Sequence, residues 1–304
     1  MIDSYYKPSG KIPLKFFLYF LLIMAIAFPI LSVVYIYLIY YIPFVYFNFL
    51  ITVGCGLVAG VIMKHAIIAG KARGPFVVLI CAIIAVFVLK YLQWCVYLPV
   101  IFSDLYEIFS FNFGERLLFS LEILISPDVV LEGIGVVNEY GAWGFYDDTA
   151  VTGVLLTIIW VIEFIVIALP AILMCKDRAK FPFSEATNAW YIESDNILES
   201  DTPGNFDEII EYMERGSFKE LVQLAQTRKT TDADFLKLTF YSPPQPASGE
   251  PHYLTIEHIT MVLNKKNETE RKSKTLAEYI GIEDQIAQEM LKRQIAEEEI
   301  LPLR

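Results

Sequence analysis

The sequence predicts an all-α membrane domain of four transmembrane helices, followed by a small soluble α+β C-terminal domain. The first observation is composition: 55% of the 304 residues are hydrophobic and the mean hydropathy is +0.48, above the range of soluble domains. The second is that the last 129 residues hold 24 of the 35 acidic and 16 of the 24 basic residues. The third is that no charged residue occurs from Phe16 to Met63. The two regions are therefore suited to different solvents.

Four apolar runs define the membrane domain, residues 16–175. The uncharged run of 48 residues is too long for one crossing of a hydrocarbon core about 30 Å thick. Pro43 lacks an N–H group and disfavours helix before it, so the chain is expected to turn back there. The tyrosines around this turn, including Tyr35, are interpreted as an interfacial belt. The expected spans are residues 16–40, 43–63, 75–102 and 149–175.

The basic residues give the orientation, because Lys and Arg near span ends are retained on the cytoplasmic side. They occur before the first span, between the second and third, and after the fourth: Lys7, Lys11, Lys15, Lys64, Lys71, Arg73, Lys176, Arg178 and Lys180. The N-terminus (residues 1–15) and the C-terminus are therefore expected in the cytoplasm. The expected location is a bacterial inner membrane, and the lipid bilayer is an expected partner of the chain.

The outer connection, residues 103–148, carries nine acidic residues and one basic residue. Leucines recur on one face between Glu115 and Ile125, which predicts an amphipathic helix in the membrane interface. Ser126, Pro127 and Asp128 predict the start of a second short helix ending near Glu132. Gly133 and the glycines after it are expected to form turns.

Two charges inside the spans require compensation, since each costs about 2.5–3.5 kcal/mol at mid-helix on insertion scales. Lys90 in the third span and Glu163 in the fourth lie at similar predicted depths, so an ion pair between them is the economical interpretation. It acts either as a structural lock or as a proton- or ion-responsive element. Gln93, Trp94 and Trp160 lie one helical turn away and are the candidate neighbours.

Gly56 and Gly60 form a G-x-x-x-G step on the second span, which favours close helix packing, within the chain or between two copies. The four cysteines lie in or at the edge of spans and are interpreted as apolar residues. No disulfide framework and no thiolate metal site is therefore expected in the soluble parts.

The C-terminal region is expected to begin with a tether, residues 176–204, and to continue as a domain, residues 205–304. Its first element is predicted as a helical hairpin from Asn205 through a capping box at Ser217. Alternating apolar residues predict strands around Leu238 and Leu254, and a polar third strand after the Asn264–Asn267 turn. A last helix is expected from Thr275 to about Ile300, with Ile282, Ile286 and Met290 on one stripe.

Two short segments share a turn composition. They are Pro182-Phe-Ser-Glu-Ala-Thr187 with Trp190, and Tyr241-Ser-Pro-Pro-Gln245 before a strand. They resemble the two knuckles of a zinc ribbon, with Ser184, Thr187, Ser242 and Gln245 where its cysteines would be. The resemblance implies a ribbon-like sheet that has lost its metal.

The sequence argues against several classes of function. A formal charge of −11 argues against a nucleic-acid partner, and the sequence has no nucleotide-binding or hydrolase motif. His252 and His258 are expected as two solvent-facing histidines on one strand, so neither a metal nor another cofactor is predicted. We expect a non-catalytic membrane scaffold or sensor whose cytoplasmic domain contacts a protein partner or a second copy. A small transporter or channel subunit using Lys90 and Glu163 is the alternative, and a membrane enzyme is third.

Overall fold

The computed structural model describes residues 5–42, 44–105, 112–141, 150–194, 198–202, 207, 211, 214–215, 234–245, 250–263, 269–285 and 287–288. The chain divides into two compact units. One is the helical unit, Ser9–Lys180, and the other joins Met1–Pro8 to Phe181–Arg304. Most of the predicted helical hairpin after Asn205 lies outside the described residues, as do the stripe positions Ile286 and Met290. Of the hairpin, residues 207, 211 and 214–215 are described, and the Arg215 N–H donates to the Glu211 carbonyl oxygen at 3.1 Å.

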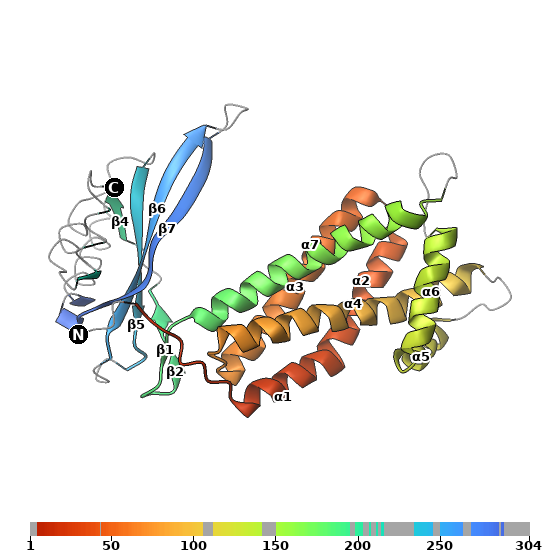
Figure 1. Ribbon diagram of the computed structural model, residues 1–304, viewed down its shortest axis with the longest axis horizontal. Helices are drawn as coiled ribbons and strands as arrows, with labels where there is room; N and C mark the ends of the chain where they lie inside the picture. Colours follow the sequence, from red (N-terminus) through yellow and green to blue (C-terminus); the bar gives the residue numbers. More distant parts are fainter. Residues whose placement is uncertain are drawn as a thin grey trace, which may run out of the picture. The chain divides into compact units, whose positions relative to one another are not determined.

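Four helices of the helical unit are long and apolar enough to cross a membrane, as in a multi-pass membrane protein. The first runs from Leu14 to Tyr41 and consists of α1 (Leu14–Leu22), a π-helical turn η1 (Ile23–Ala27) and α2 (Phe28–Tyr41). The others are α3 (Val45–Gly70), α4 (Pro75–Leu105) and α7 (Gly153–Lys180) (Figure 1). The π turn precedes Pro29, whose ring and missing N–H disturb a regular α-helix.

The helices extend beyond the C-terminal ends of the predicted spans. The second span was expected to end at residue 63 and the fourth at residue 175, but α3 continues to Gly70 and α7 to Lys180. The apolar run marks where hydrocarbon ends, whereas the helix ends where its hydrogen bonding ends. For α3 that point is Lys71, whose left-handed backbone (φ 55°) terminates the helix.

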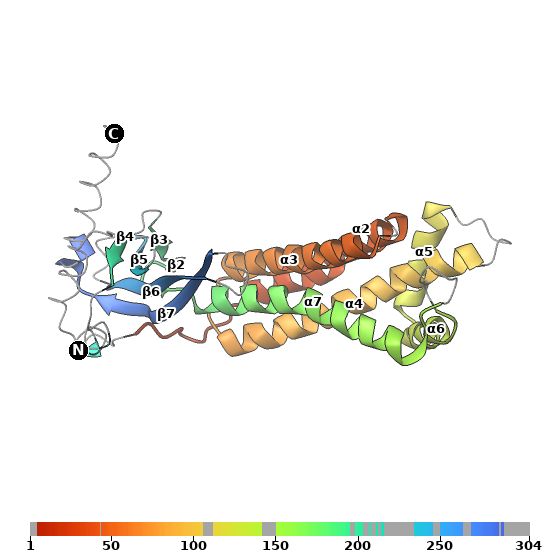
Figure 2. The same cartoon turned by 90° about the horizontal axis from the view of Figure 1, so that it is seen from above.

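The G-x-x-x-G step packs α3 against α7 within the chain, and the two helices run side by side in Figure 2. A Cβ added to Gly56 would lie 2.7 Å from the backbone oxygen of Ile167, and one added to Gly60 would lie 2.7 Å from Met174 Sδ. Gly56 therefore permits a close backbone approach that a side chain would prevent, whereas at Gly60 the nearest backbone atom, Ala171 Cα, would lie 3.1 Å from the added Cβ.

Two shorter helices follow α4, namely α5 (Phe113–Leu124) and α6 (Pro127–Tyr140). Asn112 and Glu115 form a capping box at the start of α5, two residues before the predicted beginning. The prediction that Gly133 forms a turn is wrong, because α6 continues through it. A Cβ at Gly133 would lie 2.7 Å from Leu98 Cδ1, so this glycine permits packing against α4.

The second unit is built on a five-stranded antiparallel sheet in the order β3, β5, β6, β7, with β4 also pairing with β5. Its strands are β3 (Ile192–Glu193), β4 (Leu198–Asp201), β5 (Asp234–Ser242), β6 (His252–Leu263) and β7 (Thr269–Ile282). A separate hairpin joins β1 (Phe183–Ser184) to β2 (Ala189–Trp190). Apolar residues from β5, β6 and β7 form its core: Leu236, Leu238, Phe240, Leu254, Ile256, Ala277, Ile280 and Ile282.

The prediction of a helix from Thr275 is wrong as far as Ile282, because β7 occupies Thr269–Ile282, whereas residues 284–285 and 287–288 are helical. The capping-box pattern at Thr275 is a local signal, whereas pairing with β6 buries Ala277, Ile280 and Ile282 against the core. The pairing of β7 with β6 has two register shifts, one opposite Thr255, where Tyr279 adopts a left-handed backbone (φ 55°), and one between Ile256 and Glu257.

The N-terminal segment belongs to this sheet, which the sequence analysis does not predict. Tyr5 pairs with Ile280, and the Tyr6 N–H donates to the Tyr279 carbonyl oxygen at 2.9 Å. The Tyr5 hydroxyl donates to Glu214 Oε1 at 2.8 Å, and burial together with this carboxylate raises the pKa of Tyr5 to about 12. The two ends of the chain are thus joined in one unit.

Candidate functional site: a polar cluster among the four long helices

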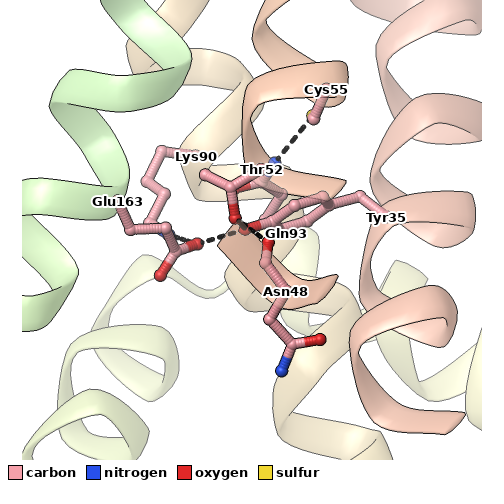
Figure 3. Close-up of polar contacts among 7 residues, drawn as sticks. All are labelled: Tyr35, Asn48, Thr52, Cys55, Lys90, Gln93 and Glu163. Carbon is pink, nitrogen blue, oxygen red and sulfur yellow. Dashed lines mark hydrogen bonds and ion pairs between the residues drawn. The ribbon is translucent and has the colours of Figure 1, made fainter. Parts of the chain in front are cut away.

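A cluster of polar side chains lies among the four long helices, and each of them contributes to it (Figure 3). The first helix supplies Tyr35, and α7 supplies Glu163. The remaining members come from α3 and α4: Asn48, Thr52, Cys55, Lys90 and Gln93. Polar groups that are removed from water must bind one another, so this cluster fixes how the helices meet.

The centre of the cluster is the contact between the two predicted charges. Lys90 Nζ donates to Glu163 Oε1 at 2.6 Å, and the side chains are 17% and 22% exposed. The ammonium group also lies 5.9 Å from the centre of the Trp94 ring, one helical turn along α4. The structure thus brings Lys90 and Glu163 together, from positions 73 apart in the sequence.

Tyr35 is the third member of this centre, and the interpretation of it as an interfacial residue is wrong. The side chain is 1% exposed, and its hydroxyl donates to Glu163 Oε1 at 2.7 Å. The signal for this role is weak in the sequence, because Tyr35 precedes several tyrosines that do suit an interface. Glu163 Oε1 therefore accepts from a cation and a phenol at once, which spreads its negative charge over two donors.

A hydroxyl relay continues from Tyr35 to α3. The Tyr35 oxygen lies 3.1 Å from Thr52 Oγ1, and the Thr52 hydroxyl donates to the backbone oxygen of Asn48 at 2.8 Å. With the Tyr35 proton on the Glu163 side, the single Thr52 proton has two acceptors to choose between. Rotation of the Thr52 hydroxyl can therefore direct its proton to either acceptor.

Two acceptor atoms of this cluster, and one hydroxyl a helical turn before Tyr35, are buried without a hydrogen-bond partner. Gln93 is 1% exposed, and its Nε2 contacts Cys55 Sγ at 3.6 Å while its Oε1 has no partner. Asn48 Oδ1 and Ser32 Oγ are likewise buried and unpartnered. A buried unsatisfied polar atom costs about 1–3 kcal/mol, so these positions are unusual in a protein interior and are candidates for a functional role.

The other predicted neighbours, Trp94 and Trp160, contact each other edge to face with ring centres 4.9 Å apart. They pack against a cluster of apolar residues from α4, α5 and α6 that includes Leu98, Ile123 and Val137. Aromatic packing therefore joins the helices beside the ion pair, and α5 and α6 take part in it.

His252 is buried and not solvent-facing, which corrects the prediction for this histidine. His252 is 4% exposed and lies between two partners, with Nδ1 3.0 Å from Ser242 Oγ and Nε2 3.0 Å from Asp284 Oδ1. Ser242 and His252 flank the loop between β5 and β6, and Asp284 follows β7. The imidazole therefore fastens three segments that are distant in sequence.

His258, further along β6, also contacts an aspartate. Its Nε2 lies 2.7 Å from Asp234 Oδ1, an oxygen that also accepts from the Thr202 hydroxyl. The hydrogen bond from Thr202 has the largest effect on the pKa of Asp234, followed by the one with His258, and both lower it. Within the described residues, no group of three His, Cys, Asp or Glu side chains is placed to hold a metal ion.

One predicted knuckle forms a tight turn between β1 and β2. The Thr187 N–H donates to Ser184 Oγ at 3.0 Å, and the Thr187 hydroxyl donates to the same oxygen at 2.7 Å. The two residues that would correspond to cysteines thus bind each other. On the second segment, Ser242 binds His252.

Comparison with protein-family models, curated proteins and solved structures finds no match to this chain.

Proposed function

We propose that the chain is a non-catalytic scaffold or sensor in a bacterial inner membrane, and that its cytoplasmic C-terminal domain contacts protein partners or a second copy. The single observation that carries this proposal is the direct contact of Lys90 with Glu163 at 2.6 Å. Charges that carry a solute must be open to it, whereas these two are closed on each other and on Tyr35. The polar cluster then serves to hold the four helices in one arrangement.

The proposed orientation, with both termini in the cytoplasm, has two supports. The first is the distribution of Lys and Arg along the connections. The second is that Tyr5 and Tyr6 pair with β7, which requires the N-terminus and the C-terminal sheet to share one side of the membrane. Four crossings meet this requirement and an odd number would not.

The proposal is tested by in-cell crosslinking of the intact chain, followed by purification in mild detergent. A photo-crosslinking residue at Ile192, which is 58% exposed on the sheet, is expected to capture a defined protein. The matched control places the same residue at Leu131 of α6, which is 70% exposed and is expected to lie on the opposite side of the membrane. Equal capture at both positions, or at neither, would count against a scaffold that acts through its C-terminal domain.

The alternative, a small transporter or channel subunit, is favoured by the buried unpartnered acceptors Gln93 Oε1 and Asn48 Oδ1. Such atoms can accept from water or from a protonated solute in another conformation of the helices. Proteoliposomes that contain a pH dye separate the two functions. Proton or ion flux that disappears in Glu163→Gln would support the transporter and overturn the scaffold.

A membrane enzyme is the third reading, and its one candidate residue set is Ser242, His252 and Asp284, which are the residue types of a hydrolytic triad. Asp284 is 67% exposed, and the imidazole that would act as the base is 5% exposed, so we propose a structural role. A fluorophosphonate probe is expected to leave the intact protein unlabelled. Labelling that is lost in Ser242→Ala would establish an enzyme.

A further inference from the structure

The last strand of the sheet, β7, has an edge that pairs with little else. β7 is the last strand in the order of the sheet, and β6 pairs with one side of it from Thr269 to Ile282. Among the residues that the structure describes, the other side pairs only at Ile280 and Tyr279, with Tyr5 and Tyr6. An edge of this kind presents backbone donors and acceptors that a further strand can bind.

The chain's own N-terminus demonstrates that this edge accepts an added strand. Tyr5 pairs antiparallel with Ile280, and the Tyr6 N–H reaches the Tyr279 oxygen at 2.9 Å. Two residues later comes Pro8, which has no N–H to donate, and the pairing does not continue. The exposed part of the edge, residues 269–275, therefore lies on a strand whose outer side strand pairing already uses.

This part of the edge is rich in basic side chains, and its pairing with β6 is regular. The side chains of residues 269–275 are all exposed, and their pairing with β6 is continuous from Leu263↔Thr269 to Glu257↔Thr275. Because side chains alternate between faces, Lys272 and Lys274 share one face with Glu270. Arg271 lies on the other face, with its guanidinium 5.8 Å from the centre of the Phe235 ring. The edge is thus positively charged within a chain of net charge −11.

We propose that the edge of β7 at residues 269–275 binds an extended acidic segment of a partner protein by strand addition. Backbone hydrogen bonds hold the segment, and Asp or Glu at alternate positions of the segment face Lys272 and Lys274. Lysines on an edge strand also disfavour pairing with another basic strand. This inference rests on the proposed function, since it names the surface by which the scaffold takes its partner.

Fluorescence anisotropy of the full-length protein in detergent tests the proposal. The probe is a short labelled peptide of alternating glutamate and threonine, and the control peptide has lysine in place of glutamate. Saturable binding is expected for the acidic peptide alone. Methylation of the peptide's backbone nitrogens is expected to abolish that binding, because strand addition needs those N–H groups.

Variants of the strand provide a matched pair. Lys272→Glu with Lys274→Glu is expected to raise the Kd of the acidic peptide about tenfold, since two attractive cross-strand pairs become repulsive. Glu270→Lys, on the same face, is expected to lower the Kd. Circular dichroism of each variant verifies that the sheet is intact.

Three results would overturn the inference. They are equal binding of both peptides, binding that survives backbone methylation, and a Kd that is unchanged in the double variant. Dimerisation of the wild type that the double variant abolishes would instead assign the edge to a second copy. If the double variant still captures the same protein at Ile192 in cells, the proposed function stands and the partner docks elsewhere.

Discussion

Replacing Lys90 and Glu163 singly and together measures what their contact contributes to the stability of the helical unit. The contact is short, at 2.6 Å, and the side chains are 17% and 22% exposed. Breaking a buried ion pair by removing one partner typically costs about 3–5 kcal/mol, because the other charge remains uncompensated. Partial exposure reduces this value, so we expect about 2–4 kcal/mol for each single change.

The geometry also predicts an order between the two single variants. Glu163→Leu removes the acceptor of both Lys90 and Tyr35, whereas Lys90→Met leaves Glu163 with the Tyr35 hydroxyl as a donor. A hydrogen bond to a charged group contributes about 1.5–3 kcal/mol, so Glu163→Leu is expected to be the more destabilising change. The double variant should recover much of the loss, since apolar contacts between helices do not require the pair.

The assay is unfolding of each variant in mixed micelles with increasing SDS, followed by circular dichroism, and the coupling energy comes from the double-mutant cycle. We expect a coupling of about 2 kcal/mol. The matched control is the Arg215–Glu211 pair in the second unit, whose side chains are 68% and 59% exposed. That pair is expected to couple by less than about 1 kcal/mol. Additive effects of Lys90→Met and Glu163→Leu would refute the reasoning.

Other predictions concern topology, packing and pH. In intact cells, a cysteine at Glu139 is expected to react with a membrane-impermeant reagent and one at Ile192 to be protected, while the four native cysteines are buried; the opposite pattern would invert the topology. Gly60→Leu is expected to destabilise the helical unit by at least about 2 kcal/mol through overpacking against α7, as measured by SDS unfolding, whereas Gly54→Leu, with no atom within 4 Å of its added Cβ, should cost less than half as much. Because the pKa of Asp234 is lowered in the folded protein, its contribution to stability is present above its unfolded pKa and is lost as the pH falls through the folded one; Asp234→Asn should therefore flatten the acid limb of the thermal stability profile, and an unchanged limb would contradict this.

The sequence determines the four long helices and the need for a charge pair. Both follow from local physical chemistry: an uncharged run of 48 residues has no favourable place in water, and a lone charge in a span requires a partner. These arguments need no knowledge of which helices are neighbours. They also predict Gly56 and Gly60 as packing positions, although not that the facing helix is α7.

Only the tertiary structure decides the other members of the polar cluster and of the sheet. Tyrosine is a residue type typical of the membrane interface, so the sequence does not distinguish Tyr35 from its neighbours. Its contact with Glu163, 128 positions away in the sequence, depends on how their two helices pack. The residues from Thr275 to Ile282 contain a helix-start signal, but pairing with β6 buries more apolar surface than an isolated helix would. His252 is enclosed by Ser242 and Asp284, and Tyr5 pairs with Ile280 from the far end of the chain. Each of these outcomes is a long-range contact, whose free energy is a property of the packed pair and not of either segment alone.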